Sequence, residues 1–190
     1  MSTISTSNTL SGIETPATGT YAIDASHSNL VVTARHLMVS KVRGLFSGVS
    51  GTITIADDPL ASNVEVVVQA DTIDTREPQR DAHLKAADFL DVENHPEITF
   101  RSTSVEQVKG ERFRLAGELT IRGVTKPVVL DFDYQGTFRD PWGGTRLGFE
   151  AKGEIDREDW DITWNAALET GGVLVSKKLT FEFELQAVKQ

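Results

Sequence analysis

Apolar and polar residues alternate with a period of two along most of the chain from residue 28 onward. Near its end, the apolar positions Leu179, Phe181, Phe183 and Leu185 are separated by polar ones. This alternation is typical of strands that bury one face and expose the other. The other runs of this kind cover residues 28–38, 44–55, 64–70, 98–102, 112–122, 128–134 and 147–155. The eight runs predict an all-β fold, an extended antiparallel β-barrel in which closure removes exposed strand edges.

Two segments interrupt the alternation. Residues 77–92 predict a short helix, because Pro78 suits a first helical turn and apolar residues follow at helical spacing. Residues 158–165 predict a helical turn that places Trp160 and Trp164 on one face. Residues 1–18 are polar and rich in Ser and Thr, which predicts a flexible N-terminal arm before a barrel domain over 19–190.

Charge and composition exclude some classes of partner. With 190 residues, the chain is long enough for a single β-barrel domain with one core. The formal net charge of −9 and the lack of a basic run argue against nucleic acid, and they disfavour an anionic membrane surface. The chain has no cysteine, which excludes disulfides and thiolate sites. Its first residues lack the charge and apolar run of a signal peptide, so the expected location is the cytoplasm.

The interior of the barrel decides the function. Several inward positions hold small residues, which either leave room for a ligand or mark bends of the strands. A hollow apolar interior suits an acyl or prenyl chain, because burial of each CH₂ group contributes about 0.8 kcal/mol. The residues expected to line such a tunnel are Leu30, Val32, Ala34, His36, Phe46, Val66, Val68, Phe100, Leu115, Leu119 and Phe149.

Few polar residues of the sequence are candidates for ligand contact, catalysis or metal binding. Arg80, Asp81 and His83 are candidate anchors for a polar head group, or they stabilise the predicted helix and its charges. His36 lies on an apolar face, either as a core histidine or as a ligand contact. The spacing of the four histidines matches no zinc motif, and no nucleophile elbow or phosphate loop occurs. We therefore expect no catalytic residues, no metal ligands and no cofactor.

Several blocks, in this order, resemble the YceI-like family of bacterial lipocalin-like proteins over about residues 20–188. They include Arg35-His36-Leu37, Ile73-Asp74-Thr75, Arg80-Asp81-Ala82-His83-Leu84 and the stretch from Gly117 to Val128. The resemblance implies an eight-stranded barrel, often a homodimer, that encloses a long isoprenoid such as an isoprenoid quinone. The chain departs from the family pattern at Val32, where an aromatic residue is common, and at Asp161, where glycine is common.

Three functions are consistent with these features. The leading prediction is a binding protein, not an enzyme, that stores or transports a polyisoprenoid or similar lipid. The second is an enzyme or accessory factor that acts on such a lipid through His36 or the group at residues 80–83. The third is a metal- or haem-binding barrel that uses His27 or His36.

Overall fold

A computed structural model describes residues 9–10 and 12–190. Its strands are β1 (Thr9–Leu10), β2 (Ile13–Glu14), β3 (Gly19–Ile23), β4 (Asn29–His36), β5 (Ser40–Phe46), β6 (Val49–Ile55), β7 (Asn63–Gln69), β8 (Ile73–Asp74), β9 (Glu97–Lys109), β10 (Arg112–Ile121), β11 (Val124–Arg139), β12 (Thr145–Asp156) and β13 (Lys178–Lys189). The helix is α1 (Pro78–Lys85), and the 3-10 turns are η1 (Ala25–His27), η2 (Pro59–Ala61), η3 (Ala70–Thr72) and η4 (Arg157–Trp160).

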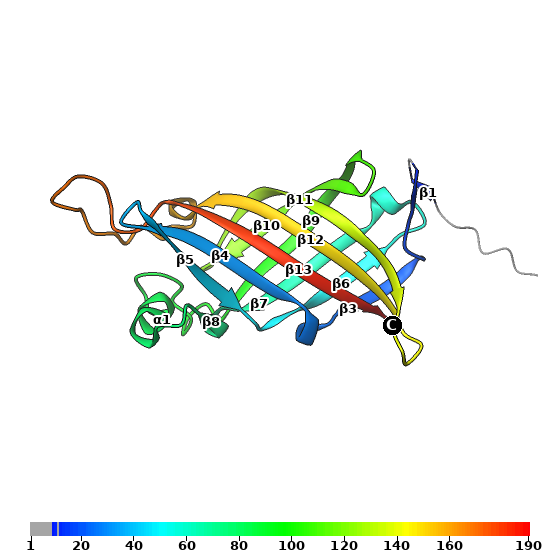
Figure 1. The fold of residues 1–190 in the computed structure, drawn as a ribbon, viewed down its shortest axis with the longest axis horizontal. Coiled ribbons are helices and arrows are strands. Elements are labelled where there is room, and N and C mark those ends of the chain that lie inside the picture. The colour runs from blue at the N-terminus through cyan, green and yellow to red at the C-terminus, as the bar shows by residue number, and fades with distance from the viewer. Residues whose placement is uncertain (1–8, 11) are drawn as a thin grey trace, which may run out of the picture.

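The predicted eight-stranded antiparallel barrel is confirmed (Figure 1). Eleven strands form one sheet, which closes on itself because β12 pairs with β13. Three of the eight positions around the barrel are held by two consecutive strands each: β3 with β4, β5 with β6, and β7 with β8. Strand β3, which the alternation did not predict, pairs with both β6 and β13.

Local chemistry sets the breaks inside these long strands. Between β3 and β4, the Asp24 side chain accepts a hydrogen bond from the backbone amide of Ser26 and caps η1. Between β5 and β6 the chain passes so close to η3 that a Cβ atom on Gly48 would come within 2.7 Å of a Thr72 methyl carbon. Gly48 therefore lies at a bend between β5 and β6, which is one of the two roles that the sequence left open for small inward residues.

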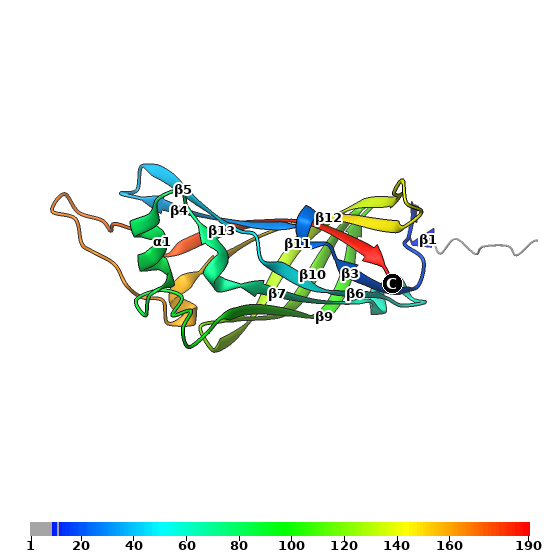
Figure 2. The ribbon, with the colours of Figure 1, turned by 90° about the horizontal axis from the view of Figure 1, so that it is seen from below.

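The two ends of the barrel differ. Helix α1 lies at one end, between β4–β5 and the opposite wall, whereas β1 and β2 lie at the other (Figures 1 and 2). At that second end Ile13 packs on Phe113 and Tyr134, and the Tyr21 hydroxyl donates to the carbonyl of Ala17. The described part of the predicted N-terminal arm thus packs against the barrel. Residues 1–8 and 11 of that arm lie outside the described residues.

Both helical segments are shorter in the structure than the sequence predicted. Helix α1 ends at Lys85, and turns continue the chain toward β9, so the helix is shorter than residues 77–92. Turn η4 ends at Trp160 because Asp161 adopts a left-handed conformation with φ of 59°. Helical spacing therefore does not relate the two tryptophans: Trp160 donates to the carbonyl of Leu119, while Trp164 packs against His83 and Phe89. No helix of the described residues is long and apolar enough to span a membrane.

The left-handed Asp161 gives a first prediction. A left-handed backbone costs an ordinary L-residue about 1–2 kcal/mol, less for aspartate, and glycine adopts it freely. Asp161→Gly should raise the free energy of unfolding by about 0.5 kcal/mol, measured by urea denaturation. Asp159→Gly, within η4, should lower it, and an equal effect of the two changes would contradict the backbone explanation.

An ion-pair network fastens the second end of the barrel. The Arg146 guanidinium lies 2.6 Å from Asp24 and 3.0 Å from Asp140, which joins β12 to the turn before it and to η1. Asp24 also accepts hydrogen bonds from the Ser26 hydroxyl and the His27 ring. The bond from Arg146, followed by those from Ser26 and His27, lowers the pKa of Asp24 well below its ordinary value of 3.8.

The lowered pKa of Asp24 predicts a pH-dependent effect. Its stabilisation is fully present above the ordinary carboxyl pKa and is lost as the pH falls below it. Asp24→Asn should therefore lower the Tm at pH 7, and the gap to wild type should shrink below about pH 4. Asp131→Asn, at an exposed carboxylate 3.8 Å from Arg114, should change the Tm little. A gap that stays constant down to pH 2 would contradict this assignment.

Candidate functional site

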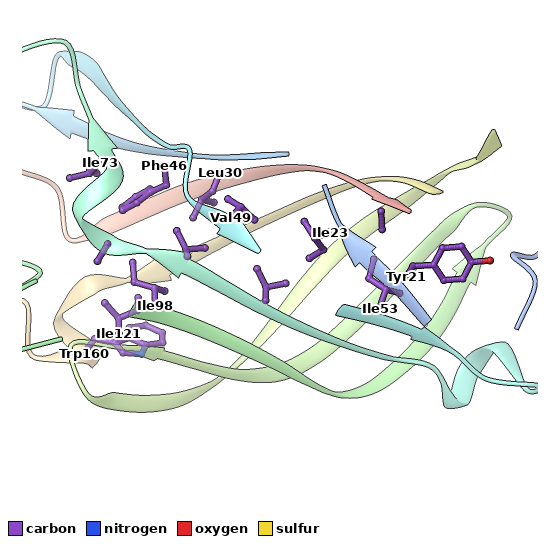
Figure 3. Close-up of a cluster of buried hydrophobic side chains, with 14 of the residues drawn as sticks. Tyr21, Ile23, Leu30, Phe46, Val49, Ile53, Ile73, Ile98, Ile121 and Trp160 are labelled. Atoms are coloured by element: carbon purple, nitrogen blue, oxygen red, sulfur yellow. The ribbon is translucent and has the colours of Figure 1, made fainter. Parts of the chain in front are cut away.

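The barrel encloses one large apolar cavity of about 510 Å³. Its volume falls within the range of about 300–1,000 Å³ that is usual for small-molecule sites. In the close-up, Leu30, Phe46 and Ile73 gather in the half nearer α1, and Tyr21 lies toward the other end (Figure 3). Because each strand alternates in and out, the inward side chains of facing strands supply this wall.

Ten of the eleven residues predicted to line a tunnel do line the cavity: Leu30, Val32, Ala34, His36, Phe46, Val66, Val68, Phe100, Leu115 and Leu119. Phe149 does not. Its ring packs 5.5 Å from Tyr134 and 6.0 Å from Phe132, in a cluster with Phe113 that fills the end of the barrel opposite α1. We call these four aromatic residues the aromatic plug. The alternation gives Phe149 the correct face but not its position along the barrel axis.

Gly117 and Gly153 face the interior but leave no void, and Gly117 lies at an irregularity in the pairing of β10 with β9. A Cβ atom on Gly117 would approach the Phe100 ring to 2.4 Å, and one on Gly153 would approach the Phe181 ring to the same distance. Each glycine thus gives an aromatic ring room to lie against the wall. Both rings line the cavity, so the two glycines keep its centre clear.

The cavity opens at the α1 end. Of the described residues that line it, only Arg35 and Gln79 are exposed to solvent, and Gln79 belongs to α1. The polar side chains of the lining gather here, and we call them the polar collar. They are His36, Thr75, Gln79, Arg80, His83 and Arg157, while Arg35 borders the opening from the outer face of β4, where it lies opposite Lys41.

The predicted anchors on α1 have distinct surroundings. Arg80 lines the cavity, with its Nε donating to the Thr75 hydroxyl and its Nη2 to the Thr75 carbonyl. Asp81 does not line the cavity; it accepts bonds from the Thr75 amide and hydroxyl and so fixes the strand-to-helix connection. His83 lines the cavity, and its Nε2 lies 2.8 Å from Asp88. Arg80 and His83 thus face the site, while Asp81 supports it.

Arg157 is a collar residue that the sequence reasoning missed. Its side chain is only 2% exposed, and it donates to the backbone carbonyls of Ser176 at 3.0 Å and Ile162 at 2.6 Å. Burial lowers the pKa of its guanidinium, and the nearby Glu158 and Asp156 act in the opposite direction. The acidic residues next to Arg157 in the sequence are typical of a solvent-exposed loop, so the neighbouring residues do not predict that Arg157 is buried.

The electrostatics of the cavity follow from these residues. Three arginines line it, and no aspartate or glutamate of the described residues does. Among the described residues, no three His, Asp or Glu side chains come together as a metal site would require. His27 lies outside the cavity, bonded to Asp24 and Ser26, whereas His36 belongs to the collar. The arrangement suits an apolar chain with an oxygen-bearing group at the open end.

Comparison with known proteins agrees with this geometry. A family model described as the YceI-like domain matches residues 21–187. The chain belongs to the YceI-like family. Protein YceI of Salmonella newport strain SL254 is 42% identical over 146 residues, which cover 75% of this chain and 76% of that protein. Protein YceI of Salmonella arizonae is equally similar over the same length.

Several solved structures share the barrel. A Campylobacter jejuni YCEI protein is 28% identical with a TM-score of 0.70, covering 82% of this chain and 90% of that one. BcnA of Burkholderia cenocepacia has a TM-score of 0.75 at 16% identity, covering 86% and 98%. A polyisoprenoid binding domain from Saccharophagus degradans has a TM-score of 0.68 at 16% identity, covering 90% and 98%. The last two likenesses show the fold.

Proposed function

We propose that this YceI-like protein binds one long isoprenoid or similar lipid in the barrel and stores or transports it. The observation that carries the proposal is the continuous apolar cavity, closed by the aromatic plug at one end and open beside α1 at the other. A chain threaded from the open end would bury its methylene and methyl groups against Val, Leu, Ile and Phe side chains. The polyisoprenoid binding domain among the structural neighbours supports the same ligand class.

The polar collar favours a head group that accepts hydrogen bonds. Arginine, glutamine and neutral histidine all donate N–H groups, and the lining offers no carboxylate to repel an oxygen-rich ligand. An isoprenoid quinone fits this pattern, with its ring carbonyls among the collar residues and its tail in the cavity. We further propose that the protein works in the cytoplasm as a homodimer.

A chain-length series of prenyl quinones tests the proposal. Binding measured by quenching of Trp164, which lines the cavity, should tighten with each added isoprene unit and then level off when the tail fills the cavity. Each buried methylene should contribute about 0.8 kcal/mol, or about fourfold in Kd. Affinity independent of tail length would show that the tail stays outside the cavity and would refute the proposal.

A further inference from the structure

The turn that joins β4 to β5 is apolar and exposed. Leu37, Met38 and Val39 form it, and they are 43%, 55% and 81% exposed. Polar residues and glycine are the usual choice for such a turn, all the more where the backbone is left-handed. Here Leu37 and Met38 have φ of 53° and 59°. The turn therefore keeps bulky apolar side chains where polar ones would be more stable in water.

A second loop extends the same surface. The backbone amide of Leu37 donates to the carbonyl of Leu174, and His36 bridges to Val175, so residues 165–176 lie beside the turn. Both segments project beyond the barrel at the α1 end (Figure 1). The loop adds further apolar side chains at least partly open to solvent: Ala166, Ala167, Leu168 and Val173. We call these four residues together with residues 37–39 the apolar tip.

Next to the apolar tip, positive charge is uncompensated. Residues 35–46 carry three basic side chains and no acidic one, although the whole chain has a net charge of −9. Arg35 and Lys41 lie directly opposite each other on β4 and β5, and Arg43 follows on the same face. No carboxylate of the described residues lies at ion-pair distance from any of the three. Like charges in facing positions are unfavourable, so this cationic strip suits an anionic partner.

The apolar tip is continuous with the opening of the cavity. Arg35 and His36 line the cavity just before the turn, and Leu174 and Val175 line it just before β13. A lipid that leaves the cavity therefore passes the inner side of the tip. Apolar side chains flanked by basic ones are the combination that holds a protein at an anionic bilayer surface.

We propose that the apolar tip and the cationic strip dock the protein on an anionic phospholipid bilayer, where the cavity exchanges its lipid. This inference rests on the proposed function. The net negative charge led us to disfavour an anionic membrane surface from the sequence alone, but screening over about 10 Å lets a local strip act independently of distant carboxylates. The opposite end also exposes aromatic side chains, with Trp142 87% exposed, but the aromatic plug closes the cavity there.

Vesicle experiments with the full chain test the docking. Vesicles of phosphatidylcholine with phosphatidylglycerol should co-sediment the protein and accept a fluorescent prenyl lipid from it faster than pure phosphatidylcholine vesicles do, and salt should weaken both effects. Val39→Asp and Met38→Asp should each slow the transfer at least tenfold. Lys41→Glu should remove the preference for anionic vesicles. Trp142→Asp, the matched control at the closed end, should behave as wild type.

Two readouts separate this inference from the proposed function. When the prenyl lipid is supplied from a cyclodextrin solution without vesicles, all variants should bind it with equal affinity. If wild type does not bind the lipid in this assay, the proposed function alone is refuted. Co-sedimentation of ligand-free protein tests the tip by itself. The inference is overturned if Val39→Asp transfers as fast as wild type, or if Trp142→Asp loses as much. It is also overturned if the tip variants convert a dimer to a monomer in light scattering without changing vesicle binding, since the tip would then be an interface between two copies.

Discussion

Val32→Trp should weaken the binding of a long-tailed prenyl quinone about 50-fold. Val32 lies on β4 opposite Gly44 of β5 and Phe181 of β13, and its side chain lines the cavity. An indole at this position would displace about three methylene groups of the tail, a loss of about 2.4 kcal/mol. The family resemblance indicates that an aromatic residue is tolerated here, so the variant should fold, with a wild-type far-UV spectrum and a similar Tm.

Two controls accompany this measurement. A short-tailed quinone that leaves part of the cavity empty should bind Val32→Trp and wild type alike. Val31→Trp places the same indole on the opposite face of β4, beside Leu45 and Glu182, and should not change the Kd of the long-tailed quinone. Equal Kd values for the long tail in wild type and Val32→Trp would show that the ligand does not occupy this part of the barrel.

Arg157→Met should produce the largest loss of stability, about 3 kcal/mol. The side chain is buried, and its guanidinium binds carbonyls on both sides of the 162–176 loop, so its removal leaves buried acceptors without donors. In a chain of this size the Tm should fall by about 6–12 °C. Amide hydrogen exchange should accelerate first in the 162–176 loop.

Arg122→Met is the matched control for this prediction. Arg122 donates a single bond of 3.3 Å to the Asp161 carbonyl from a partly exposed position. Its replacement should change the free energy of unfolding by less than about 0.5 kcal/mol. Similar losses for the two variants would mean that the buried carbonyl contacts of Arg157 contribute little.

Much of the fold could be predicted from the alternation of apolar and polar residues, because one face of each barrel strand meets an apolar interior. Strand β3 was missed since only Tyr21 and Ile23 of its five residues are buried, and η1 interrupts the alternation before β4. The end of η4 depends on the backbone conformation of Asp161, which no pattern of hydrophobicity encodes.

The sequence predicted most of the apolar residues that line the cavity. It did not predict how far the cavity extends along the barrel, or all the residues of the polar collar. Periodicity assigns a face to each residue, so Val66 and Leu119 were correctly expected to face the interior. It does not give the height at which the cavity ends, and Phe149 therefore belongs to the aromatic plug. The burial of Arg157 could not be predicted from the sequence, because it depends on hydrogen-bond partners up to 19 residues away along the chain.

Extraction of the gently purified protein with organic solvent, followed by mass spectrometry, tests the central claim most directly. The account predicts that wild type carries a prenyl or acyl compound at close to one molecule per chain, and that Val32→Trp carries less of it or a shorter one. Recovery of no such lipid from wild type, together with no uptake of added prenyl quinone, would contradict it.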